Sequence, residues 1–382
     1  MDLAPTEHQR AFRAELRSWL EQHADWDGRA PRHDDLAEEF AFLRDWQRTL
    51  ASGRWVGVTW PEEYGGRGLG PVEHAIAQEE FARAGAPELV GRIGVNLAGP
   101  TLLAHGTPEQ KARWLPHILD ASVIFCQLFS EPDAGSDLAS VKTRATRLDG
   151  GWSLSGQKVW TSYAQFADWG VCLARTNPDV PKHKGITYFV VDMHAQGVNV
   201  RPLVQLTGEA EFNEVFLDDV FVPEDQVIGE VDSGWRIANS TLSHERGINP
   251  RQLVIHTQLG DDLIRRVVTS AAYDDARIRQ QVAESYIEVR LFQLQSLRTL
   301  SRLAKGAEPG PEGSASKLYW SQMSQRMHDV GMKVLGGDAA MNGAWQRSWL
   351  YYRAASIWAG TNEIQRNIVG ERVLGLPKEP AP

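Results

Sequence analysis

The stretch ITYFVV at Ile186–Val191 is a short apolar run, rich in β-branched and aromatic residues, of the kind that forms a buried strand. Runs of similar character lie nearby at Gly170–Leu173 and Val198–Val200, and turn-forming residues bound each of them. Between two further strand-like runs, Asp149-Gly150-Gly151 predicts a hairpin turn. Residues 121–228 are therefore predicted to form a small antiparallel β domain.

Helical periodicity flanks this region on both sides. Near the N-terminus, Thr6 and Gln9 fit a capping box. Apolar residues then recur at helical spacing, first at Phe12, Leu16, Trp19 and Leu20, and beyond the β region at Ile255, Leu259, Leu263 and Val267 and at Tyr319, Met323, Met327, Val330 and Val334. We therefore predict an α+β protein with an N-terminal helical domain (1–120), a middle antiparallel β-barrel domain (121–228) and a C-terminal four-helix bundle (229–382).

Composition limits the classes of partner. The 382-residue chain has a formal net charge of −9, which argues against nucleic acid or an anionic membrane as the main partner. Any polyanionic ligand must instead be held by local basic groups and backbone amides. The two cysteines, Cys126 and Cys172, are too few for a disulfide framework, so we expect a cytoplasmic location. No run approaches the roughly 18 apolar residues of a membrane span.

Several familiar site motifs are excluded by their spacing. The glycines of Gly65–Gly70 do not fit G-x-G-x-x-G, because Pro71 stands where the last glycine must be. The 11 histidines include no H-x-x-x-H pair and neither cysteine has a partner at ligand spacing, so no metal site is predicted. No G-x-S-x-G suggests a serine hydrolase. From the residues alone, the prediction stops at an enzyme of helical–β–helical order with an unidentified site.

Three longer motifs identify a family. FSEPDAGSD at Phe129–Asp137 resembles the TEPxAGSD signature of acyl-CoA dehydrogenases, and GQKVWTS at Gly156–Ser162 resembles the family's GxKxWITN. IWAGTNEIQR at Ile357–Arg366 resembles its IYEGTxEIQR. The motifs occur in the family's order, and the resemblance covers nearly the whole chain. It implies an FAD-dependent enzyme that desaturates an acyl-CoA thioester between its α and β carbons.

The resemblance also assigns residues to the flavin ring. A flavin is a flat apolar ring with polar edges, so it needs an aromatic wall and short hydroxyl or amide donors. The motifs place Ser130 and Ser162 at the ring edge and Trp160 against its face. Gln127 and Phe129 lie on the strand beside them, and Ser136 lies near the thioester end of CoA. A tryptophan in a β domain is ordinarily a core residue, so Trp160 is assigned to the flavin only because of its motif.

Family members bind the adenine and diphosphate of FAD across a subunit interface. KVLGG at Lys333–Gly337 resembles the QxxGG segment, in which Gly336 and Gly337 let backbone amides approach the ligand. Thr361 and Glu363 fall at cofactor-contacting positions and Gly360 at a substrate-contacting one. Residues 276–282, ARIRQQV, lack the Phe and Gly of the family's RxxFG, although Arg277 remains a candidate for the diphosphate. Either this region has drifted with compensation, or the chain has lost some cofactor contacts in a mixed complex of two paralogous subunits.

The reaction needs a carboxylate that removes the α proton. Many relatives carry it just before the Gly-Thr of the last motif, but here that position is Ala359. The isovaleryl-type branch carries it in an LxxER segment, and this chain reads LSHER at Leu242–Arg246. We therefore assign Glu245 as the base, with Ser243 and Arg246 at the substrate. A Glu-Arg pair at the start of a helix is the simpler alternative.

The resemblance implies partners as well as residues. The substrate is an acyl-CoA, electron-transfer flavoprotein is the usual acceptor, and the assembly is a homotetramer, a dimer or a heterotetramer with a paralogue. Two other functions stay open. One is a flavin oxidase of the same fold, in which oxygen takes the electrons. The other is a non-catalytic subunit that completes the flavin site of a partner.

Overall fold

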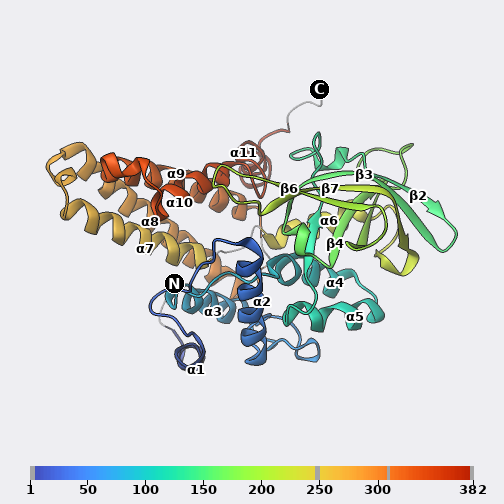
Figure 1. The fold of residues 1–382 in the computed structure, drawn as a ribbon, viewed down its shortest axis with the longest axis horizontal. Coiled ribbons are helices and arrows are strands. Elements are labelled where there is room, and N and C mark those ends of the chain that lie inside the picture. The colour runs from blue at the N-terminus through green and yellow to red at the C-terminus, as the bar shows by residue number, and fades with distance from the viewer. Residues whose placement is uncertain (1–4, 246–249, 308–309, 379–382) are drawn as a thin grey trace. The chain divides into compact units, whose positions relative to one another are not determined.

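The computed structural model describes residues 5–245, 250–307 and 310–378, without the side chains of residues 243–245. The chain forms two compact units (Figure 1). The sheet unit consists of Pro31–Leu69 and Pro87–Glu245, and the helical unit of Met1–Ala30, Gly70–Ala86 and Arg246–Pro382. Along the chain, helices precede and follow a middle part that contains the strands, as predicted. The exact division at residues 120 and 228 stays a prediction.

The strands of the sheet unit form one mixed sheet. In chain order they are β1 (Phe125–Leu128), β2 (Arg144–Leu148), β3 (Gly151–Ser162), β4 (Trp169–Arg175), β5 (Ile186–Asp192), β6 (Val198–Leu203), β7 (Phe212–Pro223) and β8 (Val227–Ile228). Their order in the sheet is β6-β7-β3-β2-β4-β5-β8, and β1 pairs with β4. Most neighbours are antiparallel, but β1 runs parallel to β4.

The predicted β-barrel is not found, because this sheet is open. Closure requires every strand to pair on both sides. Within the described residues, β6 pairs only with β7, and β8 pairs only with β5. Strand β8 is two residues long, which leaves little backbone for a further ladder. The prediction of an antiparallel domain was also wrong at β4, which pairs in parallel with β1 and, at Arg144 and Arg175, with β2.

Local sequence explains the centre of the sheet. The six residues of the ITYFVV run form all of β5 except Asp192 and are fully buried, so this part of the strand is covered on both faces. The hairpin prediction is confirmed, since Asp149 and Gly150 join the antiparallel strands β2 and β3. Gly150 has φ +75°, a conformation that glycine adopts without strain.

The helices of the sheet unit pack by apolar faces and by a few buried polar contacts. They are α2 (Leu36–Ser52), α4 (Gly99–His105), α5 (Pro108–Leu119) and α6 (Gly234–Glu245). Thr107 caps α5 through a capping box with Gln110. In α2, the fully buried amide of Gln47 donates to the carbonyls of Ile118 and Leu119, at 3.0 and 3.2 Å. It also accepts from the backbone N–H of Gly91, at 2.8 Å. Gln47 therefore connects α2 to the end of α5.

The helical unit is built from α1 (Glu7–His23), α3 (Pro71–Arg83), α7 (Pro250–Val268), α8 (Ala276–Leu303), α9 (Glu312–Leu335), α10 (Ala344–Tyr352) and α11 (Asn362–Ile368). The predicted capping box at Thr6 and Gln9 is confirmed at the start of α1. The core draws on α7 to α10, and includes Leu263, Val267 and Met327 at predicted positions. Periodicity thus located α7 and α9 correctly.

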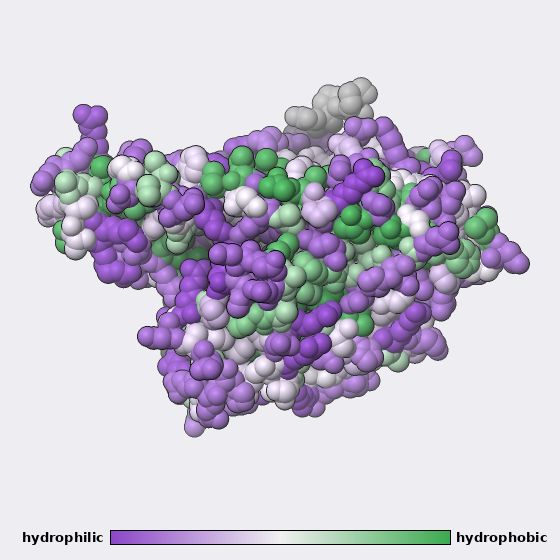
Figure 2. Space-filling view, viewed as in Figure 1, coloured by the Kyte–Doolittle hydropathy of each residue, from purple (hydrophilic) through white to green (hydrophobic). Residues whose placement is uncertain are grey.

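None of the helices in the described residues is both long enough and apolar enough to cross a membrane. On the face drawn in Figure 2, hydrophobic residues occur in small groups among hydrophilic ones.

Candidate functional site

Strand β3 carries an irregularity at Trp160. The pairing of β3 with β7 shifts between Lys158 and Thr161, so two residues of β3 face one residue of β7. Within this bulge Trp160 has φ +60° and leaves 60% of its surface exposed. A bulky residue in the left-handed region is strained, and strained, bulged positions concentrate at functional sites. The backbone therefore presents a large aromatic side chain to the outside of the sheet.

The segment that follows β1 lies directly beside this bulge. The backbone N–H of Val159 donates to the carbonyl of Ser130 at 2.9 Å, which places Ser130 next to Trp160. Gln127 and Ser130 are half-buried. Phe129 is only 4% exposed and packs edge-on against Tyr188. What Phe129 offers to a ligand is therefore its backbone more than its ring.

Ser162 completes this group at the end of β3, where it pairs with Phe212 of β7 and is half-buried. The ring of Phe212 meets the indole of Trp160 edge-on, with centroids 6.2 Å apart. The structure thus brings Ser130, in the segment after β1, together with Trp160 and Ser162 of β3 on one part of the sheet.

A buried ion pair supports the same segment. The ammonium of Lys158, fully buried, donates to Glu131 Oε1 at 2.8 Å and to the carbonyls of Phe129 and Leu173 at 3.2 and 2.7 Å. Glu131 also accepts from the backbone N–H groups of Lys142 and Thr143, at 2.6 and 2.9 Å. Burial by itself raises the pKa of Glu131, but the Lys158 charge and these hydrogen bonds outweigh it and hold the pKa below its ordinary value. Sequence reasoning missed this pair, although both residues lie inside the quoted motifs.

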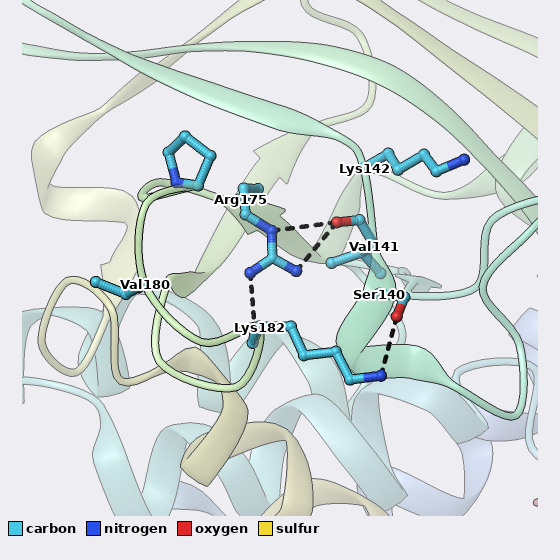
Figure 3. Close-up of a pocket in the computed structure, with 7 residues that line it drawn as sticks. Ser140, Val141, Lys142, Arg175, Val180 and Lys182 are labelled. Atoms are coloured by element: carbon cyan, nitrogen blue, oxygen red, sulfur yellow. Dashed lines mark hydrogen bonds between the residues drawn. The ribbon is translucent and has the colours of Figure 1, made fainter. Parts of the chain in front are cut away.

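A cavity opens farther along the same loop. It has a volume of about 420 Å³ and is lined by Ser140, Val141, Lys142, Arg175, Pro178, Val180 and Lys182 (Figure 3). The Arg175 guanidinium donates to the carbonyls of Val141 and Lys182 and lies between them. Burial lowers the pKa of Arg175, while the charge of Glu131 opposes that effect. The arginine is therefore a fixed cation held by neutral carbonyls.

Lys182 adds a second cation to this cavity. Its ammonium pairs with Asp137 at 2.7 Å and donates to the hydroxyl of Ser140 at 3.3 Å. Ser136, the predicted CoA contact, is exposed immediately before Asp137. The sequence signal that could have located this cavity is the Lys182-His183-Lys184 run in the loop after β4.

The remaining predicted cofactor residues lie in the helical unit. Arg277 is exposed in the first turn of α8, and Lys333 near the end of α9 donates to Gln281 of α8 at 3.1 Å. Gly336, with φ +56°, and Gly337 follow α9, and a Cβ at either position would meet open space. The structure therefore brings Arg277 and Lys333 onto neighbouring helices beside an accessible glycine turn.

The last motif begins α11 through a strained turn. Ala359 and Gly360 have φ +53° and +82°, and Gln365 donates to the Ala359 carbonyl at 2.9 Å. Thr361 caps α11 by accepting from the backbone N–H of Ile364. The exposed Glu363 pairs with Arg366 at 3.0 Å. Thr361 and Gln365 thus stabilise the start of α11 and the turn that precedes it.

The segment predicted to hold the base is described only in part. Helix α6 ends at Glu245, and the backbone of Ser243 and Glu245 belongs to it. The side chains of both residues lie outside the described part of the chain, as does Arg246 entirely.

Comparison with known proteins gives the family. Models of the acyl-CoA dehydrogenase N-terminal, middle and C-terminal domains match residues 6–122, 126–220 and 232–374. Acyl-CoA dehydrogenase IpdE1 of Mycobacterium tuberculosis is 41% identical, over 96% of this chain and 98% of that protein. The chain belongs to the acyl-CoA dehydrogenase family. It is an oxidoreductase with FAD as its cofactor.

Solved structures of similar fold include two named as pairs of chains. The ChsE4-ChsE5 complex from Mycobacterium tuberculosis has a TM-score of 0.84 at 29% identity, covering 99% of this chain and all of that one. The Tcur3481-Tcur3483 steroid ACAD has a TM-score of 0.85 at 27% identity, with the same coverage.

The residues of the sheet unit fit the flavin of an acyl-CoA dehydrogenase. A flat ring needs an aromatic wall and polar groups at its rim. The exposed indole of Trp160 on its strained bulge can supply the wall, and the half-buried Ser130 and Ser162 can supply the polar rim.

Proposed function

We propose that the protein desaturates an acyl-CoA between the α and β carbons, with Glu245 as the base that removes the α proton. Bound FAD supplies the acceptor of the β hydride. The observation that carries the proposal is the strained, exposed Trp160 beside Ser130. The left-handed backbone of Trp160 costs conformational free energy, and a ligand that packs on the exposed indole would explain why this conformation is kept.

The choice of base rests on two positions. Residue 359, where many relatives carry a carboxylate, is an alanine at φ +53° and cannot take up a proton. Glu245 is the last described residue of α6 and belongs to the LSHER segment. The base would need a water-poor setting that raises its pKa toward the working pH. This assignment agrees with the isovaleryl-type branch of the family.

The cavity beside Ser136 supports an acyl-CoA substrate. Coenzyme A is polyanionic, and a chain with a net charge of −9 must bind it through local cations. Arg175 and Lys182 line the cavity together with the apolar side chains of Val141 and Val180, and Lys182 pairs with Asp137, the residue after Ser136. We infer that the phosphates of the substrate lie against these two cations.

A second subunit type is part of the proposal. The similar structures named above are each a pair of differently named chains. In this chain, residues 276–282 lack the family's Phe and Gly, and Lys333 replaces a glutamine. We therefore propose a heterotetramer with a paralogue, a bulky acyl group such as a steroid side chain or ring, and electron-transfer flavoprotein as the acceptor. The two cysteines are free and buried, which suits a cytoplasmic location.

The test is the visible spectrum of the purified protein, followed by anaerobic addition of straight-chain, branched and steroid acyl-CoAs. We expect a bound flavin whose absorbance bleaches with one class of substrate. Glu245→Gln should keep the flavin but lose about 10² to 10⁴-fold in turnover, which is the contribution of a general base. Glu230→Gln, at an exposed carboxylate before α6, is the control and should behave as wild type.

The contrary outcomes are distinct. Full activity of Glu245→Gln would move the base elsewhere. A colourless protein that gains flavin only with a paralogue would indicate the non-catalytic subunit, and rapid peroxide formation under air would indicate an oxidase.

A further inference from the structure

Glu131, in the loop between β1 and β2, and Lys158, in β3, form a charge pair that the reaction itself does not use. Lys158 is 0% exposed and Glu131 6%, and their charged groups lie 2.8 Å apart. Burying two charges is costly, and a buried ion pair often stabilises a fold no better than apolar residues of the same size. A function beyond stability would explain why the sheet unit retains the pair.

The hydrogen bonds of the pair converge on the predicted flavin residues. Lys158 donates to the carbonyl of Phe129 and Glu131 accepts from Lys158, so the residues on both sides of Ser130 are held by one ammonium group. The carbonyl of Ser130 itself accepts from Val159, the residue after Lys158. Ser130 therefore has little freedom to move relative to β3.

The same lysine determines where Trp160 lies. Lys158 is the last regularly paired residue before the bulge, two positions before Trp160. Its third hydrogen bond, to the carbonyl of Leu173 at 2.7 Å, connects this point of β3 to β4. Because the side chain of Lys158 is buried among β3, β4 and the segment after β1, it fixes the start of the bulge against both neighbours.

Glu131 extends the connection to the next segment. Its carboxylate receives the backbone N–H groups of Lys142 and Thr143, which lie just before β2. The loop from Glu131 to Lys142, which contains Ser136, is therefore closed at its base by one carboxylate. The five hydrogen bonds of Lys158 and Glu131 have donor–acceptor distances between 2.6 and 3.2 Å.

We propose that Lys158 and Glu131 are positioning residues, which hold Ser130 and Trp160 at the separation that the flavin ring requires. This inference rests on the proposed function, because it assumes that these two residues contact the flavin. A misplacement of about 1 Å in such a site can cost about 100-fold in rate. The pair would act through Ser130 and Trp160, without touching the substrate.

The experiment compares three variants of the full-length holoprotein. Lys158→Met removes the charge and all three hydrogen bonds at similar length. The double variant Glu131→Gln/Lys158→Met leaves no uncompensated buried charge. It therefore provides a folded protein to measure if the single variant fails to fold. Gln47→Met is the matched control: Gln47 is also fully buried in the sheet unit and also makes three hydrogen bonds, but none of them is to a predicted flavin residue.

The measurements are the unfolding midpoint, the flavin absorption spectrum, the flavin reduction potential, and kcat and KM separately. We expect both Lys158 variants to have an altered flavin spectrum and potential and a kcat lowered by about 100-fold, with a smaller change in KM. Gln47→Met should lower the unfolding midpoint while the flavin spectrum and kcat stay at wild-type values.

Other results would overturn the inference. Wild-type spectra and kcat in the folded Lys158 variants would show that the pair only stabilises the fold. If neither Lys158 variant folded while Gln47→Met did, the role of the pair would also be stabilisation of the fold. A wild-type protein that binds flavin but is not bleached by any acyl-CoA would instead contradict the proposed function and leave the spectral comparison intact.

Discussion

Two buried histidines make the helical unit sensitive to acid. His256 of α7 and His328 of α9 are both 0% exposed. In each ring Nδ1 donates to a backbone carbonyl, that of Gln252 or Ser324, at 2.7 Å. Each Nε2 then accepts from a serine hydroxyl, Ser324 at 3.0 Å or Ser348 at 2.7 Å. Both neutral imidazoles are fully hydrogen-bonded, so a further proton brings a charge into an apolar surrounding.

The free-energy cost follows from the two pKa values. Burial lowers the pKa of both histidines from 6.5 to about 4. For His328 the nearby Arg353 lowers it further and Asp329 opposes this, while His328 itself lowers the pKa of His256. The unfolded chain therefore binds more protons than the folded one below pH 6.5, so stability falls as the pH falls and the loss is complete below about 4. As the pH falls from about 7 to about 5, each histidine lowers the free energy of unfolding by about 2 kcal/mol, and the pair lowers it by about 4 kcal/mol.

Urea unfolding at these two pH values tests the calculation. His256→Gln and His328→Gln cannot be protonated, so each should reduce the pH-dependent loss of unfolding free energy by about 2 kcal/mol, with an unchanged dependence on urea. His8→Gln is the control, because the side chain of His8 is 66% exposed and lies in the same unit. If both glutamine variants lost as much stability toward acid as wild type, the histidines would not be the buried neutral groups described here.

Two further predictions concern Trp160 and the cysteines. Trp160→Gly should weaken FAD binding by about tenfold or more, equal to about 1.4 kcal/mol of lost contact, yet raise the unfolding free energy of the apoprotein by about 1 kcal/mol because it relieves the left-handed strain. Flavin titration and urea unfolding check both effects, and unchanged affinity would remove Trp160 from the site. Cys126 and Cys172 should resist thiol reagents in the native protein, because both are fully buried, and burial raises the pKa of both thiols, that of Cys172 to about 11. A thiol titration with and without denaturant measures this, and rapid labelling of the native protein would contradict it.

Local features of the fold could be predicted because neighbouring residues determine them. The capping box of Thr6 and Gln9 and the turn at Asp149 and Gly150 depend on a few adjacent residues. Whether the sheet closes depends on strands far apart in sequence, and the expected barrel was wrong for that reason. Residues 1–30 and 70–86 group with the C-terminal helices, and this grouping also depends on contacts between residues far apart in sequence.

The candidate site, like the fold, could be predicted from the sequence only in part. Its motifs identified Ser130, Ser162 and Trp160, but only the three-dimensional structure shows that Trp160 lies on a strained bulge. Lys158 and Glu131 are 27 residues apart. Nothing in their local sequence indicates that they meet, since a charged residue in a strand is ordinarily exposed. Burial of the Phe129 ring could not be foreseen either, because it depends on packing against β5.

The β2–β3 hairpin offers a practical attachment point. Residues 146–150 at its tip are all exposed, and the turn is made by the backbone of Asp149 and Gly150. Exposed loop tips of this kind accept inserted peptides and new chain ends. A surface-binding tag placed there would immobilise the enzyme by the end of β3 opposite to the end that carries Trp160.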